Sequence, residues 1–111
     1  MRQAIERLLA AAGHATVAFE SAEALLAADV APGAACFVLD VRLPGISGFE
    51  LHAQLRENGI ERPVIFVTAH DEATSRDAAT RAGAMAFLPK PFAGRSLLDA
   101  VTRALGGRAG G

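Results

Sequence analysis

The chain has 111 residues, of which 11 are Lys or Arg and 12 are Asp or Glu, so its formal net charge is −1. A charge this close to balance argues against a protein that wraps nucleic acid or lies on a membrane surface, because it provides no strong field to attract polyanions. The composition, 51% hydrophobic and 21% charged, excludes a disordered tail and predicts one globular domain with a real core.

The first third of the chain predicts a helix, a short strand and a second helix. Apolar residues recur at helical spacing over residues 5–12, and Gly13 follows as a stop signal, so the chain opens in an amphipathic helix. The weak alternation of Ala15–Phe19 predicts a short strand. Ser21 is placed to cap the helix that follows.

Two continuous apolar runs in the middle of the chain predict strands that are covered on both faces. Cys36–Leu39 is the first run, and it terminates in Asp40. Val64–Val67 is the second run, and it terminates in Thr68. Between them, Ser47–Glu50 has the Ser-x-x-Glu form of a capping box, which predicts the start of a helix. A carboxylate and a hydroxyl therefore stand at the carboxyl ends of two predicted strands.

The last third predicts a helix, a strand and a final helix. Residues 71–83 read as an Ala-rich helix that Asp71 caps, and residues 84–88 as the last strand, which Pro89-Lys90-Pro91 ends. An apolar stripe over residues 97–105 predicts the closing helix. Residues 106–111, Gly-Gly-Arg-Ala-Gly-Gly, predict a flexible tail or the start of a linker.

Strands that alternate with helices predict a parallel sheet with helices on both faces, and ligands of such sheets gather at the carboxyl ends of the strands. Asp40, Thr68 and Lys90 each close a different predicted strand. Taken singly, they are readily explained as a turn former, a local hydrogen-bonding residue and a solvated lysine. Together they predict a phosphoryl site, in which the carboxylate attacks phosphorus, the hydroxyl donates a hydrogen bond and the ammonium offsets negative charge.

Three segments carrying these residues resemble a known family. They are Phe-Val-Leu-Asp-Val-Arg-Leu-Pro-Gly-Ile-Ser-Gly, Val-Ile-Phe-Val-Thr-Ala-His and Ala-Gly-Ala-Met-Ala-Phe-Leu-Pro-Lys-Pro-Phe, in that order. The chain resembles the response-regulator receiver domain of two-component signalling. The resemblance implies that Asp40 is the phospho-acceptor, Thr68 the switch hydroxyl, Phe87 the switch aromatic and Lys90 the phosphoryl-binding lysine. It also implies a cis bond between Lys90 and Pro91.

The resemblance runs to about Leu105 and implies a flavodoxin-like, doubly wound α/β fold over residues 1–105. The implied function is to take a phosphoryl group from a histidine kinase or phosphotransfer protein and to switch a partner-binding face, without being an enzyme. The resemblance also implies that a second copy of the chain can bind through the last helical face to form a homodimer. The motifs are most similar to those of receivers that precede a separate helix-turn-helix DNA-binding domain. We therefore expect this domain itself not to bind nucleic acid directly. We also expect a cytoplasmic protein without a membrane segment, since no signal sequence or uncharged stretch of spanning length is present.

One departure from the family concerns magnesium. Receivers normally begin with a central strand ending in two acidic residues, which hold Mg²⁺ with the phospho-acceptor, here Asp40, and a backbone carbonyl, here that of Arg42. Met1 already corresponds to the family's first helix, and Glu6 lies on that helix, so the acidic pair is absent. We therefore expect weak Mg²⁺ binding, slow or absent phosphorylation and a gap in the sheet. Either the gene product starts further upstream, which the intact remaining motifs favour, or the receiver is degenerate.

Two other functions stay open. One is a degenerate receiver that binds partners independently of phosphate. The other is a phosphatase of the haloacid-dehalogenase type, against which Arg42 stands where a second acid is required. Other conspicuous residues carry no site: Cys36 is the single cysteine and excludes an internal disulfide, and His14, His52 and His70 lack metal-ligand spacing and are interpreted as surface or loop residues.

Overall fold

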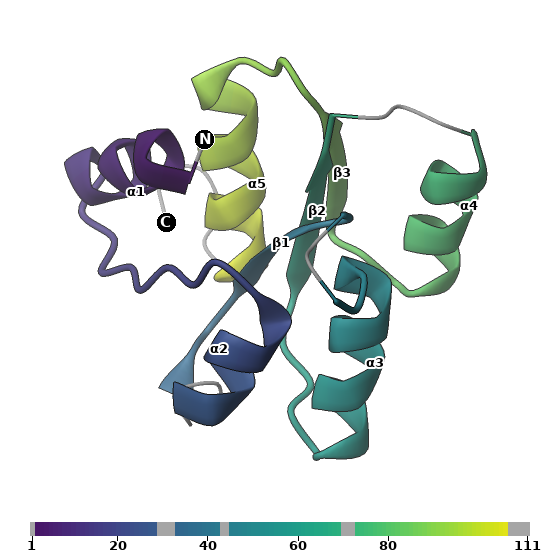
Figure 1. Ribbon diagram of the computed structural model, residues 1–111. Helices are drawn as coiled ribbons and strands as arrows, with labels where there is room; N and C mark the ends of the chain where they lie inside the picture. The colour runs from purple at the N-terminus through teal and green to yellow at the C-terminus, as the bar shows by residue number, and fades with distance from the viewer. Residues whose placement is uncertain (1, 29–32, 43–44, 70–72, 107–111) are drawn as a thin grey trace.

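The computed structural model of the chain describes residues 2–28, 33–42, 45–69 and 73–106, which form helices arranged around a small sheet (Figure 1). The elements, in chain order, are α1 (Arg2–Ala11), α2 (Ala22–Ala28), β1 (Phe37–Asp40), α3 (Gly48–Glu57), β2 (Val64–Thr68), α4 (Ala73–Arg81), β3 (Ala86–Pro89) and α5 (Gly94–Ala104). The last strand is shifted by up to two residues from its predicted bounds and includes Pro89. Of the predicted tail, Gly106 is the last described residue, and residues 107–111 lie outside the described part of the chain.

The three described strands are parallel and lie in the order β1-β2-β3. Every residue of the central strand β2 is buried, which is why its sequence is a continuous apolar run rather than an alternating one. Asp40 pairs with Val67, and Thr68 pairs with Pro89, so the three strands end at one edge of the sheet. The predicted α/β class with a parallel sheet is confirmed.

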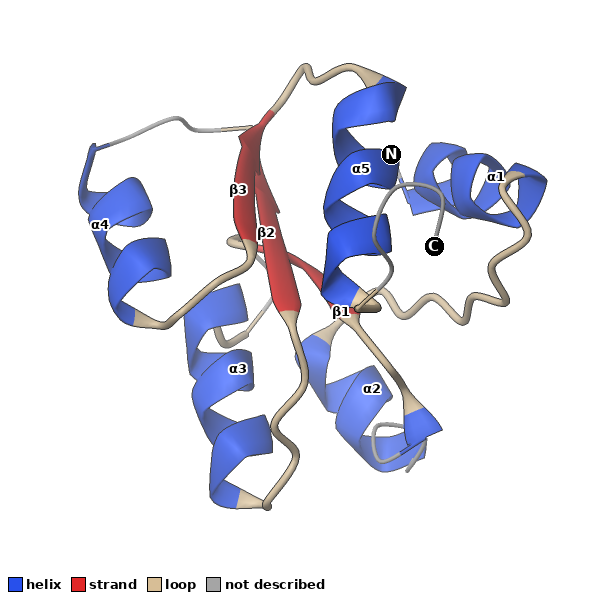
Figure 2. Cartoon of the chain, turned by 180° about the vertical axis from the view of Figure 1, so that it is seen from behind, coloured by secondary structure: helices blue, strands red, loops and turns tan. Residues whose placement is uncertain are grey.

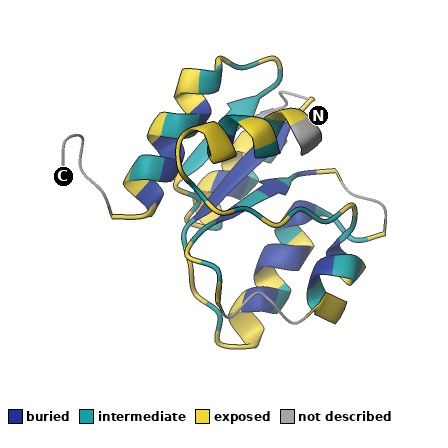
Figure 3. Cartoon of the chain, turned by 90° about the vertical axis from the view of Figure 1, so that its left-hand side faces the viewer, coloured by how far each residue is buried: buried dark blue, intermediate teal, exposed yellow. Residues whose placement is uncertain are grey.

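Helices cover both faces of the sheet (Figure 2). Successive residues of a strand point to opposite faces, so β2 contributes Phe66 to one core cluster and Ile65 and Val67 to another. The cluster around Phe66 includes buried residues of α2, α3 and α4, whereas the other cluster includes Leu9 of α1 and the inner residues of α5. Burial coloured along the chain follows the same division, with dark blue segments directed to the sheet (Figure 3).

Two predicted helix caps are present. The Ser47 hydroxyl accepts a hydrogen bond from the Glu50 N–H at 3.1 Å, and the Glu50 carboxylate accepts one from the Ser47 N–H at 2.9 Å, which completes the capping box of α3. At α2, the Ser21 hydroxyl accepts from the Ala24 N–H at 3.1 Å. The predicted cap at Asp71 lies outside the described residues.

The strand predicted over Ala15–Phe19 is wrong. These residues form no strand in the structure, and the first strand along the described chain is β1. A cavity of about 1220 Å³ is lined by this segment and by β1, so among the described residues the segment has no neighbouring strand with which to form a ladder. Val17 is 70% exposed as a result. The gap in the sheet that the sequence leads us to expect is therefore visible as a groove.

The interpretation of His52 as a surface or loop residue is also wrong, because the residue is buried in α3. It lies on the inner side of α3 with 8% exposure, and its ring meets the Phe66 ring edge-on at 5.9 Å between centroids. His14 is half-buried, and His70 lies outside the described residues. Within the described ranges, every helix is too short or too polar to cross a bilayer.

Candidate functional site

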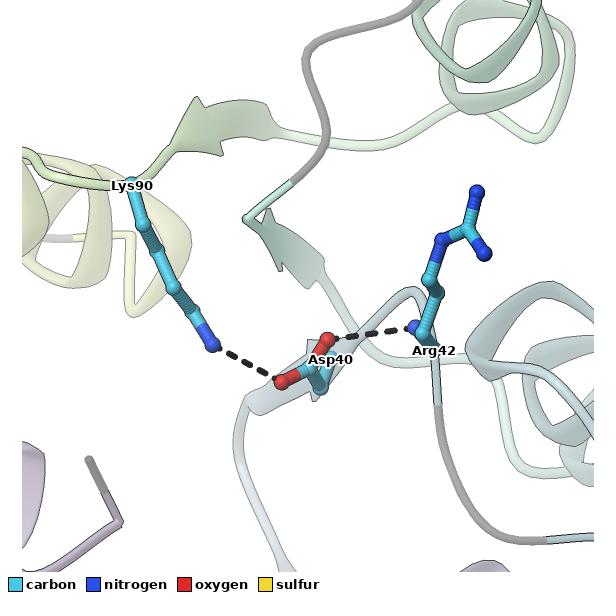
Figure 4. A network of polar contacts seen from close by, with 3 residues as sticks. All are labelled: Asp40, Arg42 and Lys90. Carbon is cyan, nitrogen blue, oxygen red and sulfur yellow. Dashed lines mark hydrogen bonds and ion pairs between the residues drawn. The ribbon is translucent and has the colours of Figure 1, made fainter.

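The carboxyl edge of the sheet brings Asp40, Thr68 and Lys90 together from positions far apart in the sequence. The Lys90 N–H donates to the Thr68 carbonyl oxygen at 2.6 Å, which places the lysine beside the end of β2. From there its side chain reaches across to β1, and Nζ donates to Asp40 Oδ2 at 2.9 Å (Figure 4). Parallel pairing produces this convergence, because residues at the same end of neighbouring strands share one edge. The Lys90–Pro91 bond is cis, as the resemblance implies.

Both carboxylate oxygens of Asp40 accept hydrogen bonds. Oδ2 accepts from Lys90, and Oδ1 accepts from the Arg42 N–H at 3.1 Å (Figure 4). The Asp40 side chain is 33% exposed, whereas that of Lys90 is only 14% exposed. The site is therefore a charged pair at the surface, open on the carboxylate side and covered on the ammonium side.

The turn after β1 fixes the backbone of Asp40. The Val41 N–H donates to the Val67 carbonyl at 2.9 Å, and the Gly48 N–H donates to the Val41 carbonyl at 2.9 Å. Gly48 approaches so closely that a Cβ there would collide with the carbonyl oxygen of Asp40. Glycine at this position lets α3 begin directly against the end of β1.

Thr68 and Phe87 lie deeper than Asp40. Thr68 is fully buried, and Phe87 is half-buried in β3, where it pairs with Phe66. The guanidinium of Arg76 on α4 lies over the Phe87 ring, 5.2 Å from its centroid, in a cation–π contact. Sequence reasoning did not predict this contact, because it depends on how α4 packs on β3. The spacing of the residues gives no signal for it.

Magnesium does not fit the residues present. In the portion of the chain that the structure describes, no three His, Cys, Asp or Glu side chains lie close enough to hold a metal ion. Asp40 is a single carboxylate, and both of its oxygens already have donors. One carboxylate is a poor competitor for the tightly held water of Mg²⁺. The donor set implied by the resemblance, Asp40 with the Arg42 carbonyl, is thus insufficient by itself.

Residues 1–102 match the family described as the response regulator receiver domain. Among curated proteins, the chain is 40% identical over 104 residues to nodulation protein W of Bradyrhizobium diazoefficiens, covering 94% of this chain and 46% of that protein. It is 39% identical over 106 residues to the transcriptional regulatory protein FixJ of Azorhizobium caulinodans, covering 96% of this chain and 50% of that protein. The chain thus spans half or less of the length of these two relatives.

Solved structures give the same result. The structure of the response regulator StyR superposes with a TM-score of 0.85 at 39% identity, covering 96% of this chain and 54% of that one. The family match over residues 1–102 includes the strand ends where Asp40, Thr68 and Lys90 lie.

Proposed function

This chain belongs to the receiver-domain family of response regulators, and on that premise we propose that it accepts a phosphoryl group on Asp40 from a histidine kinase or phosphotransfer protein. The observation that carries the proposal is the 2.9 Å contact between the Asp40 carboxylate and the Lys90 ammonium at the carboxyl edge of the sheet. A partly exposed carboxylate can be reached by a donor, and a covered ammonium beside it stabilises added negative charge.

In the transfer, an Asp40 carboxylate oxygen attacks the phosphorus of a phosphohistidine. The P–O bond forms as the P–N bond breaks, and the imidazole leaves and takes up a proton. Lys90 then exchanges its contact with Oδ2 for one with the phosphoryl oxygens, and the Arg42 N–H, already directed at the carboxylate, is a second donor. Phosphoryl transfer relies heavily on a metal to neutralise charge, so without a fitting metal site we expect the reaction to be slow.

Thr68 and Phe87 are the residues we propose to report the modification. Thr68 is fully buried at the end of β2, and we propose that its hydroxyl turns toward a phosphoryl group once Asp40 carries one. Phe87 lies on the neighbouring strand β3, and we propose that its ring shifts together with Thr68. Because Arg76 lies over the Phe87 ring, movement of the ring also moves the contact that ties α4 to β3. The surface formed by α4, β3 and α5 would thereby change its shape, and a partner that binds this surface would detect the change.

The test is prolonged incubation with an excess of a small phosphoramidate or acyl phosphate, followed by intact-mass analysis. We expect a slow gain of one phosphoryl group, abolished by Asp40→Asn and reduced by Lys90→Met. No gain on the unaltered chain, or an equal gain on Asp40→Asn, would defeat the proposal. As an acceptor rather than an enzyme, the chain should not turn over a generic phosphomonoester.

A second candidate is a phosphate-independent interaction module. It is favoured by the two donors that already occupy the Asp40 carboxylate and by the poor fit to magnesium. In this case a partner, or a second copy bound through the outer face of α5, associates equally well with the unaltered chain and with Asp40→Asn. Loss of association in the variant would instead support the phosphate switch.

A further inference from the structure

Phe87 packs against a set of aromatic rings on one face of the sheet. It is the register partner of Phe66 on β2, and it lies against the core cluster that contains Phe66. Phe66 is fully buried, and its ring centroid lies 4.6 Å from that of Phe49 and 5.9 Å from that of His52. Because close packing holds this cluster in place, any movement of the Phe87 ring takes place on its other, more exposed side.

Arg76 covers the Phe87 ring from α4. Its guanidinium lies 5.2 Å from the ring centroid, and the residue is exposed. The face of an aromatic ring attracts a cation, and a planar guanidinium also stacks on it. At an exposed position, such a contact changes an equilibrium between two arrangements by about two- to fivefold. The contact is therefore strong enough to bias the position of the ring and weak enough to be broken.

The other contacts of α4 attach it to the sheet only weakly. Among the α4 residues whose burial the structure describes, only Ala79 is buried, and its methyl group removes little apolar surface from water. The Thr80 hydroxyl donates to the Arg76 carbonyl oxygen at 3.0 Å, so this hydrogen bond lies within the helix. The contact between Arg76 and Phe87 thus contributes a substantial part of the attachment of α4 to β3.

The same structure shows the site before modification. The Lys90 ammonium is paired with the Asp40 carboxylate at 2.9 Å, and this pair must open before the ammonium can contact a phosphoryl group. A contact that is made in only one of two states stabilises that state. If the Phe87 ring moves when Asp40 is modified, loss of its contact with Arg76 opposes the modification.

We propose that Arg76 is a positioning residue for phosphoryl transfer. Its guanidinium holds the Phe87 ring in the arrangement of the unmodified chain and thereby slows transfer to Asp40. This role rests on the proposed function, in which the ring shifts together with Thr68. Arg81, the other arginine of α4, does not share the role, because a spacing of five residues places it on a different side of the helix.

The experiment combines a fluorine reporter on the phenylalanine rings with replacement of each arginine of α4. Arg76→Met removes the charge and keeps an apolar stem and a high helix propensity, and Arg81→Met is the matched control on the same helix. All six phenylalanines are labelled with meta-fluorophenylalanine, and Phe87→Leu identifies the signal of position 87 by its loss. Fluorine NMR then follows this ring before and after addition of the small phosphodonor.

We expect Arg76→Met to move the Phe87 signal toward its position in the phosphorylated chain and to speed phosphoryl uptake by about two- to fivefold relative to Arg81→Met. Arg76→Lys keeps the charge without the planar group, so it should show a smaller change than Arg76→Met. Equal Phe87 signals in Arg76→Met and Arg81→Met, or equal rates of uptake, would overturn the role of Arg76.

The two proposals fail in different ways. Uptake at equal rates in the two methionine variants overturns the role of Arg76 and leaves Asp40 as the acceptor. Absence of uptake from every chain overturns the proposed function, and with it the effect of Arg76 on transfer. The fluorine signal of the unphosphorylated variants is measured without any transfer, so it tests independently whether Arg76 positions the ring.

Discussion

The contact between Asp40 and Lys90 can be measured by a double-mutant cycle. Lys90→Met removes the ammonium while keeping most of the apolar stem, and Asp40→Asn removes the charge with little change in shape. The double variant removes both partners. The difference between the double variant and the sum of the single ones isolates the interaction between the two side chains.

The geometry sets the magnitude. Two unit charges 2.9 Å apart attract each other by about 6 kcal/mol at an effective dielectric constant near 20. Most of this attraction is offset, because Lys90 is only 14% exposed and loses hydration, and because Asp40, at 33% exposed, is screened by water. We expect a net coupling free energy of about 1–2 kcal/mol, decreasing modestly from low to high salt.

Urea unfolding of the four proteins at pH 7 provides the assay, with slopes compared to confirm that each unfolds in the same way. A coupling free energy below about 0.3 kcal/mol would mean that the pair does not form in solution. The assignment of Lys90 to a phosphoryl group on Asp40 would then lose its structural basis. Arg103→Met, on the last turn of α5, is a matched control for loss of a cation and should show no coupling to Asp40→Asn.

Three further predictions concern the surroundings of the site. Burial, and then the positive charge of Arg56, lower the pKa of His52 below 6.5, so the folded state binds fewer protons than the unfolded state; melting temperatures should fall as the pH drops below 6.5, and His52→Leu should weaken this dependence. Phe66→Ala should reduce the free energy of unfolding by about 3–5 kcal/mol in urea titrations, because its side chain is fully buried beneath Phe49 and His52; a loss under 1 kcal/mol would contradict the packing described. Gly48→Ala should displace the backbone of Asp40 and slow the rate of phosphoryl uptake, whereas Ala53→Gly on the same helix should leave that rate unchanged.

The sequence predicts the strand ends well because their signals are local. A buried strand is an uninterrupted apolar run, and the first polar residue after it marks its end, which is how Asp40 and Thr68 are found. Lys90 follows from the same reasoning at the third strand. The parallel order of the strands then brings these positions to one edge with no need for contact information.

What the sequence does not predict depends on neighbours. Ala15–Phe19 alternates like a strand, but a strand forms only where a neighbouring strand provides backbone hydrogen-bond partners. In this structure a groove separates the segment from β1, so the two do not pair. His52 looks like a surface histidine until the packing of α3 places it against Phe66. The contact of Arg76 with Phe87 likewise depends on how α4 packs against β3, and the spacing of residues in the sequence does not predict that packing.

The most direct test of the account is to locate the modification. After incubation with the small phosphodonor, borohydride reduction converts an aspartyl phosphate to homoserine, and peptide mass mapping identifies the residue that carried it. The account predicts homoserine at position 40 alone, with less of it in Lys90→Met. Homoserine at another aspartate, or none at position 40 while the intact chain gains mass, would contradict it.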